Sequence, residues 1–211
     1  MIRIVIADDH DIVRAGLKQL IADDPEMEVT GEAKTGEHLI ELVKKNDYDV
    51  VLLDIKMSGI SGIEAIKHIK AIKPNLPIIV LSMHSEDQYA VRTIKAGASG
   101  YVTKDSAGEN LVSAIKKVAA GGKYISPTLA ETLAEALAGG GTQLPHESLT
   151  DREFQVMCMI ASGKTVSEIA SELFLSVKTV STYRQRLLEK MNMKNNSEIT
   201  HYVIKNNLLD I

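Results

Sequence analysis

The sequence predicts a doubly wound, five-stranded parallel α/β sheet followed by an all-α domain of four helices. Residues 50–54, Val-Val-Leu-Leu-Asp, form an unbroken apolar run ending in a carboxylate, which is typical of a strand buried on both faces. Four further strand-like runs alternate with segments of helical periodicity before residue 122. Beyond a glycine-rich break at residues 139–145, the apolar spacing is helical. Together these observations predict two domains.

The first domain contains five strands and five helices that alternate along the chain. The expected strands are residues 2–7, 28–33, 50–54, 78–82 and 100–103. The expected helices are residues 11–21, 36–45, 62–72, 87–96 and 107–120. Parallel strands need crossover connections, so this alternation predicts a doubly wound sheet. In the first helix, three- and four-residue spacing predicts one buried face made of Ile12, Val13, Leu17, Leu20 and Ile21.

Polar side chains stand where four of these strands end. They are Asp8 and Asp9, Asp54, Ser82, and Lys104. The carboxyl ends of parallel strands share one edge, so we expect these side chains to meet in one crevice. Carboxylates held together repel unless they are protonated or bind a cation, and their hard oxygens suit Mg²⁺. A lysine and a hydroxyl opposite them fit a phosphoryl group. The alternative is that each is a helix cap or a surface charge.

This pattern of Asp8-Asp9, Asp54, Ser82 and Lys104 resembles the flavodoxin-like receiver domain of bacterial two-component response regulators, over residues 1–122. The resemblance implies that Asp54 accepts a phosphoryl group from a histidine kinase. It also implies three further sets of roles. Mg²⁺ is bound by Asp9, Asp54, the backbone carbonyl of Lys56 and, through water, Asp8. Lys104 pairs with the phosphoryl oxygens, Ser82 hydrogen-bonds them in the active state, and Tyr101 is the aromatic whose rotamer follows that hydroxyl. The resulting changes at Ser82 and Tyr101 are expected to bias an element that has two alternative conformations and involves residues 85–97.

The connection between the domains is expected at residues 123–145. Residues 126–137 are rich in Ala, Leu and Glu and are predicted to be helical. The run Gly-Gly-Gly-Thr-Gln-Leu-Pro at residues 139–145 predicts a flexible linker. The predicted organisation is therefore a first domain at 1–122, a partly helical linker at 123–145 and a second domain at 146–211.

The second domain has the pattern of a helix-turn-helix. Thr150 and Glu153 form a capping box that starts a helix ending at Gly163. A short helix over residues 166–173 is followed by a turn, after which Ser176 caps a longer helix that carries several basic residues. A fourth helix is expected at residues 198–205. Two helices joined by a short turn are typical of this motif, and an ordinary α-hairpin remains the alternative.

A helical wheel divides the longer helix into two sides. The predicted buried side is Val177, Val180, Leu187, Leu188 and Met191. The opposite side is Lys178, Thr182, Gln185, Arg186 and Glu189, with Thr179 and Ser181 at its margins. Hydroxyls, an amide and basic groups together can contact base edges and phosphates in a DNA groove.

Four motifs of residues 146–211 resemble the LuxR/NarL/FixJ family of DNA-binding domains. They are Leu149-Thr-x-Arg-Glu153, Ile160-Ala-x-Gly163, Glu168-Ile-Ala170 and Thr179-Val180. The run Thr-Val-Ser-Thr-Tyr-Arg at residues 179–184 is most similar to the GacA/UvrY-type global regulators. The resemblance implies base contacts from Ser181, Thr182 and Gln185, and phosphate contacts from Lys178, Thr179 and Arg186.

Charge and cysteine content narrow the class of protein. From Thr150 onward there are eight basic and seven acidic residues, so the acidic excess lies in the first domain, which argues against that domain binding nucleic acid alone. Cys158 is the one cysteine, so no internal disulfide can form, and its apolar surroundings predict a buried thiol. With no basic-then-apolar leader and no apolar run of about 18 residues, we expect a cytoplasmic protein without a membrane span.

Together these features predict a phosphorylation-switched transcription factor that binds promoter DNA as a homodimer. It would not be an enzyme beyond its own phosphoryl transfer and slow dephosphorylation. One alternative is a Mg²⁺-dependent phosphatase with Asp54 as nucleophile. Another is an adaptor whose terminal helices bind a protein and not DNA.

Overall fold

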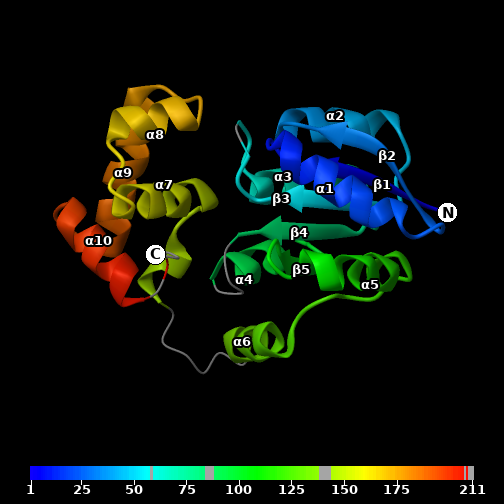
Figure 1. The fold of residues 1–211 in the computed structure, drawn as a ribbon. Coiled ribbons are helices and arrows are strands. Elements are labelled where there is room, and N and C mark those ends of the chain that lie inside the picture. The colour runs from blue at the N-terminus through cyan, green and yellow to red at the C-terminus, as the bar shows by residue number, and fades with distance from the viewer. Residues whose placement is uncertain (58, 84–87, 138–143, 207, 209–211) are drawn as a thin grey trace. The chain divides into compact units, whose positions relative to one another are not determined.

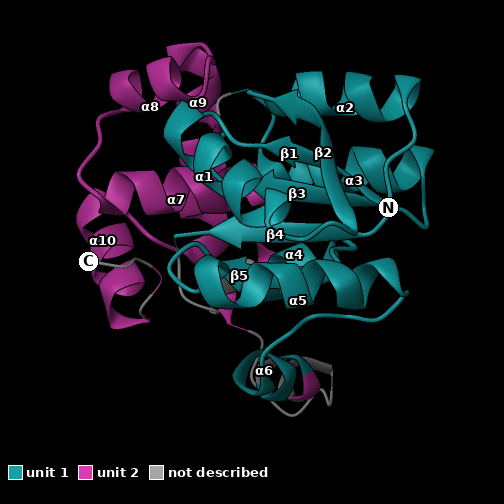
Figure 2. Cartoon of the chain, turned by 45° about the vertical axis from the view of Figure 1, so that its right-hand side comes forward, with its two compact units in different colours: residues 1–133 teal, residues 134–211 magenta. Residues whose placement is uncertain are grey.

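The protein consists of two compact units, residues 1–133 and residues 134–211 (Figure 2). The structure is a computed structural model, and the residues that it describes are 1–57, 59–83, 88–137, 144–206 and 208. Most of the predicted glycine-rich linker, residues 139–145, therefore lies outside the described residues. None of the helices in the described part of the chain is long and apolar enough to span a membrane.

Unit 1 is built on a parallel sheet of five strands in the order β2-β1-β3-β4-β5 (Figure 1). The strands are β1 (Ile2–Ala7), β2 (Met27–Ala33), β3 (Val50–Asp54), β4 (Ile78–Ser82) and β5 (Gly100–Thr103). Every residue of β3 and β4 is buried, which explains why the sequence carries unbroken apolar runs there. The predicted doubly wound sheet is confirmed.

Helices cover both faces of this sheet. They are α1 (Asp11–Ala22), α2 (Gly36–Lys45), α3 (Gly62–Ile72), α4 (Gln88–Lys95) and α5 (Ala107–Ala119). One apolar cluster joins α1 and α5 to the sheet, and a second joins α2, α3 and α4 to its other face. Gly62 allows α3 to begin directly against β3, because a Cβ there would lie 2.7 Å from the Ile55 Cα.

Helix α1 departs from the predicted buried face at one residue. Leu17 and Ile21 are buried as expected, and Val13 and Leu20 are partly buried, but Ile12 is 88% exposed. Arg14 is buried instead, with Nη1 donating to the Asp8 carbonyl oxygen at 2.8 Å. An arginine can occupy an interior position when its donors are satisfied, which apolar periodicity does not register.

The segment that follows α5, up to residue 133, is part of unit 1 and packs against its sheet. Tyr124 forms a parallel bridge with Gly100 at the edge of β5, and the Tyr101 N–H donates to the Tyr124 carbonyl oxygen at 3.0 Å. Gly100 admits this contact, because a Cβ there would lie 3.1 Å from that oxygen. The predicted helix follows as α6 (Pro127–Leu137), and its Leu129 is fully buried in the same apolar cluster as Tyr101.

Unit 2 is helical. Its elements are the 3₁₀ helix η1 (Pro145–Ser148), α7 (Asp151–Ala161), α8 (Val166–Glu172), α9 (Val177–Met191) and α10 (Asn196–Lys205). The predicted capping box is present, with the Thr150 N–H donating to Glu153 Oε2 at 2.8 Å. The Cys158 thiol is buried, as its apolar neighbours predicted. The sequence-based prediction of a four-helix second domain is confirmed.

Candidate functional site

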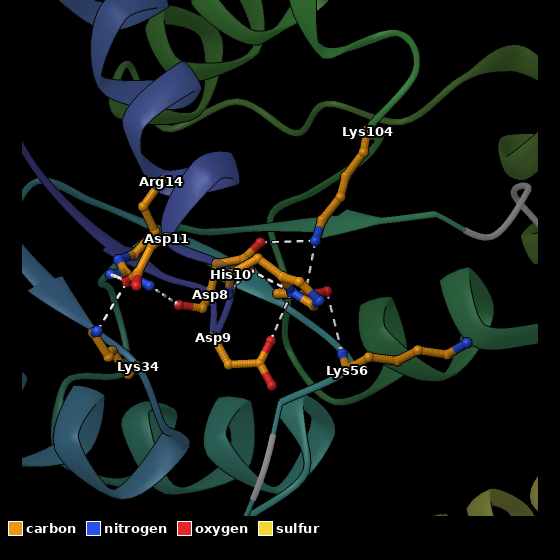
Figure 3. Close-up of polar contacts among 9 residues, drawn as sticks. Asp8, Asp9, His10, Asp11, Arg14, Lys34, Lys56 and Lys104 are labelled. Atoms are coloured by element: carbon orange, nitrogen blue, oxygen red, sulfur yellow. Dashed lines mark hydrogen bonds and ion pairs between the residues drawn. The ribbon is translucent and has the colours of Figure 1, made fainter.

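The polar strand ends of unit 1 meet at the carboxyl edge of the sheet. Asp54 is the last residue of β3, and Asp8 and Asp9 directly follow β1, which pairs with β3. Lys104 follows β5 and reaches back across this edge toward Asp8 (Figure 3). The structure therefore brings Asp8, Asp9, Asp54 and Lys104 together as the strand pattern predicted.

Lys104 bridges two buried carboxylates. Its Nζ lies 2.7 Å from Asp8 Oδ2 and 2.9 Å from Asp54 Oδ2. Asp8 is fully buried and Asp54 is 3% exposed, so neither carboxylate can be solvated by bulk water. A buried charge needs a partner, and one ammonium serves both of these anions. The site thus holds more negative than positive charge.

The pKa values of these groups reflect burial and pairing. Burial raises the pKa of Asp54 above its ordinary value, against the opposing effect of the Lys104 ammonium. Burial lowers the pKa of Lys104, but the Asp8 hydrogen bond and the Asp54 charge outweigh it and leave that pKa raised. Lys104 therefore stays cationic, and a second cation beside Asp54 would favour the ionised form of its carboxylate.

The acidic side chains fit a divalent cation. One oxygen each from Asp8, Asp9 and Asp54 and one nitrogen of His10 all lie within 4.8 Å of one another. Clustered carboxylate oxygens are the donors that Mg²⁺ takes. The Lys56 N–H donates to Asp54 Oδ1 at 3.2 Å, so this loop backbone lies beside the cluster, while the ligand role of its carbonyl stays a prediction.

His10 and Arg14 belong to the surroundings of this site but were not among the residues predicted from the sequence. His10 Nδ1 lies 2.8 Å from Asp9 Oδ1 and 3.2 Å from Asp8 Oδ1. Arg14 pairs with Asp11, which also lies 2.8 Å from the Lys34 Nζ (Figure 3). The available signals were the position of His10 directly after the acidic pair and the i, i+3 spacing of Asp11 and Arg14.

The two predicted switch residues are both buried on neighbouring strands. Ser82 ends β4 and is 2% exposed, and Tyr101 lies in β5 with its ring fully buried. Strands β4 and β5 pair in parallel, with Ser82 opposite Thr103. Of the expected two-state segment 85–97, residues 85–87 lie outside the described residues.

Unit 2 presents a helix-turn-helix. Helices α8 and α9 are joined by a short turn in which Phe174 adopts a left-handed φ of 54°. Ser176 then caps α9, its hydroxyl accepting from the Thr179 N–H at 3.0 Å. The cap starts the longer helix at Val177, as the sequence indicated.

The candidate DNA-contacting residues lie on the outer side of α9. Five of them are exposed, namely Lys178, Ser181, Thr182, Gln185 and Arg186. Thr179 is partly buried, and its hydroxyl lies 2.8 Å from Ser176 Oγ. Val180, Leu187 and Met191 are buried as predicted, and Leu188 is partly buried. The prediction was wrong for Val177, which is 50% exposed, because the buried face of α9 begins one turn later, at Val180.

These features define a class of protein in which an acidic α/β receiver is joined to a helix-turn-helix domain. Residues 4–116 match the model of the response regulator receiver domain, and residues 147–203 match that of bacterial regulatory proteins of the luxR family. The chain is 38% identical over 211 residues to the response regulator GacA of Pseudomonas aeruginosa, covering 100% of this chain and 99% of GacA. It is 39% identical over 209 residues to UvrY of Escherichia coli, covering 99% and 96%. The chain belongs to the LuxR-type response regulators.

Solved structures agree with this family. RcsB of Salmonella enterica serovar Typhimurium, bound to promoter rprA with the phosphomimetic BeF₃⁻, is 28% identical, with a TM-score of 0.66 over 96% of this chain and 98% of RcsB. A LuxR-family response regulator from Aurantimonas sp. is 37% identical, with a TM-score of 0.60 over 65% of this chain and 99% of its own.

The family identifies the present chain as a transcription regulator controlled by phosphorylation and not as a classical enzyme. Receivers use Mg²⁺ at an acidic pocket, which Asp8, Asp9 and Asp54 form here.

Proposed function

We propose that Asp54 is the residue that accepts a phosphoryl group from a sensor histidine kinase, and that the phosphorylated protein binds promoter DNA as a homodimer. The observation that carries this proposal is the contact of one ammonium, Lys104 Nζ, with both Asp8 and Asp54 at 2.7 and 2.9 Å. This contact sets a carboxylate and a cation side by side at the sheet edge where open α/β folds bind their ligands.

The transfer is a displacement at phosphorus. A carboxylate oxygen of Asp54 attacks the phosphorus of a phosphohistidine, the new O–P bond forms as the N–P bond breaks, and the imidazole leaves with the electron pair. Lys104 neutralises phosphoryl oxygens from its place beside Asp54. Asp9, Asp54, the Lys56 carbonyl and, through water, Asp8 would hold Mg²⁺, which would supply further positive charge to these oxygens. The receiver catalyses this transfer and a slow hydrolysis of the product.

The acyl phosphate changes the charge and the packing around it. It adds roughly two negative charges to the crevice, and the Ser82 hydroxyl hydrogen-bonds one of the new oxygens. The Tyr101 rotamer follows this hydroxyl. Because Tyr101 shares an apolar cluster with Leu129 of α6, its movement reaches the segment that leads toward unit 2.

The exposed side of α9 contacts DNA. Ser181, Thr182 and Gln185 contact base edges, while Lys178, Thr179 and Arg186 contact phosphates. The exposure of five of these six residues on a helix preceded by a short turn supports this assignment. Two copies bound to a two-fold site place two such helices in successive turns of the major groove.

Labelling the acceptor tests the first step. The full-length protein is incubated with acetyl phosphate and Mg²⁺ and run on a phosphate-affinity gel. We expect wild type to form a retarded band that hydroxylamine removes, and Asp54→Asn to form none. Asp105→Asn, at an exposed carboxylate next to Lys104 in the sequence, is the matched control and should label as wild type does.

A gel shift tests the output. Acetyl phosphate and Mg²⁺ should strengthen salt-sensitive binding of wild type to a promoter duplex and leave Asp54→Asn unchanged. Retention of the label in Asp54→Asn would contradict the choice of acceptor. Turnover of a small phosphate ester without DNA binding would instead favour a phosphatase.

A further inference from the structure

Val177 is an exposed apolar residue at the start of the helix that we propose contacts DNA. It is the first residue of α9 and is 50% exposed, whereas Val180, one turn later, is fully buried. An apolar side chain left in water has unused capacity to bury surface. Single exposed apolar residues are common, so the surroundings of Val177 decide what this one does.

Val177 lies in line with two proposed base-contacting residues. Side chains four residues apart share one face of a helix, so Val177, Ser181 and Gln185 form one exposed row. A second exposed row runs beside it, made of Lys178, Thr182 and Arg186. Val177 is the apolar end of an otherwise polar surface.

Polar members of these rows already have hydrogen-bond partners within α9. Thr182 Oγ1 donates to the Lys178 carbonyl oxygen at 3.0 Å, and Gln185 Nε2 donates to Glu189 Oε1 at 3.0 Å. On binding DNA they exchange one hydrogen bond for another, which yields a small net gain. Val177 has no hydrogen bond to exchange, since its gain comes from removing apolar surface from water.

The major groove offers one apolar feature that distinguishes a base, the 5-methyl group of thymine. Helix-turn-helix proteins place the N-terminal residues of their second helix against base edges. We infer that Val177 contacts the 5-methyl group of a thymine in each half-site and so determines specificity at that position. This inference rests on the proposed DNA binding by α9.

Replacing thymine with deoxyuridine tests it, because this change removes the 5-methyl group alone. A site is first selected from a random duplex pool with the phosphorylated full-length protein, and each thymine is then replaced in turn. At one thymine in each half-site, we expect the affinity of wild type to fall about fourfold, the equivalent of one buried methyl-sized group. Val177→Ala should bind both duplexes alike, and Val177→Ile should keep the preference.

Phe174 provides a matched control. It is 75% exposed and lies in the turn before α9, outside both rows, with a φ of 54° that glycine adopts freely. Phe174→Gly therefore keeps the turn and should keep the fourfold preference for thymine.

Three results overturn the inference while leaving DNA binding intact. They are a selected site without thymine, a scan in which no methyl group matters to wild type, and a Val177→Ala variant that still prefers thymine. If the pool yields no bound duplex, the proposed DNA binding fails, and this inference fails with it.

Discussion

The acidic site of unit 1 and the outer side of α9 in unit 2 hold their charged side chains in opposite ways. In the acidic site, Asp8 and Asp54 are buried and share the Lys104 ammonium before any phosphoryl group arrives. On α9, Lys178 and Arg186 are exposed, and within the described residues no ion pair engages either of them. The first region is preorganised by desolvated charge, while the second keeps its charges in water for a partner.

The two arrangements of charge suit the two proposed functions, phosphoryl transfer and DNA binding. Phosphoryl transfer depends on fixed charges around the reacting atoms, and such charges act most strongly where water is excluded. DNA binding depends on releasing counterions from phosphates, which needs accessible cations more than rigid ones. Substitutions in the two regions should therefore differ in kind: folding stability changes in one and salt dependence in the other.

Removal of Lys104 should give the largest effect. Lys104→Met leaves Asp8 and Asp54 buried without their shared cation, so we expect a loss of about 3–5 kcal/mol in the free energy of unfolding of unit 1. Urea denaturation followed by circular dichroism measures it. Mg²⁺ should restore part of the loss, because a ligand that binds the folded state stabilises it.

Lys56→Met is the control for this variant, since the Lys56 side chain is exposed and only its backbone N–H contacts Asp54. It should unfold as wild type does. Equal stability of Lys104→Met and wild type would mean that the acidic site is not organised by buried charge.

The packing of α6 gives the second prediction. It tests whether the folded core of unit 1 includes residues beyond α5. Leu129 is fully buried against the apolar cluster of α2, α3 and α4, so Leu129→Ala should cost about 2–5 kcal/mol in the same denaturation experiment. Ile12→Ala, at a residue that is 88% exposed, should change stability by less than about 0.5 kcal/mol. A loss of stability in Ile12→Ala but not in Leu129→Ala would contradict both the exposure of Ile12 and the burial of Leu129.

Sequence patterns predict some features of the two regions and miss others, for physical reasons. Asp8, Asp54 and Lys104 were predictable because parallel strands bring their carboxyl ends to one edge. Val177 was misassigned because a helical wheel treats a face as covered along its whole length, whereas the buried face of α9 starts at Val180. The burial of Leu129 depends on contacts between segments far apart in the sequence, which local composition does not encode.

A buried carboxylate in unit 2 tests whether paired charge there behaves as it does in unit 1. Glu153 is 2% exposed, lies 2.6 Å from the Lys190 Nζ and accepts from the Thr150 N–H. Burial raises its pKa, but these hydrogen bonds outweigh burial and leave the pKa below the ordinary 4.5. Because the folded pKa lies below the unfolded one, this stabilisation is present above the unfolded value and is lost as the pH falls through the folded value.

Glu153→Gln should therefore lower the stability of unit 2 by about 1–2 kcal/mol at pH 7 and flatten its loss of stability in acid. Thermal unfolding of the full chain at a series of pH values measures both effects. Glu147→Gln, at an exposed carboxylate of η1, is the control. An acid profile that is the same in Glu153→Gln and wild type would show that Glu153 gains nothing from its partners.

Lys178 should show the smallest effect on folding and a distinct one on binding. Its ammonium is exposed, so Lys178→Ala should leave the unfolding midpoint unchanged. If Lys178 contacts a phosphate, the variant should weaken binding to all sequences alike and reduce the slope of log affinity against log salt by about 1. Titrations of a selected and a scrambled duplex at several salt concentrations measure this. A changed base preference with an unchanged slope would move Lys178 from the phosphates to the base edges, whereas a loss of folding stability would erase the contrast between the two regions.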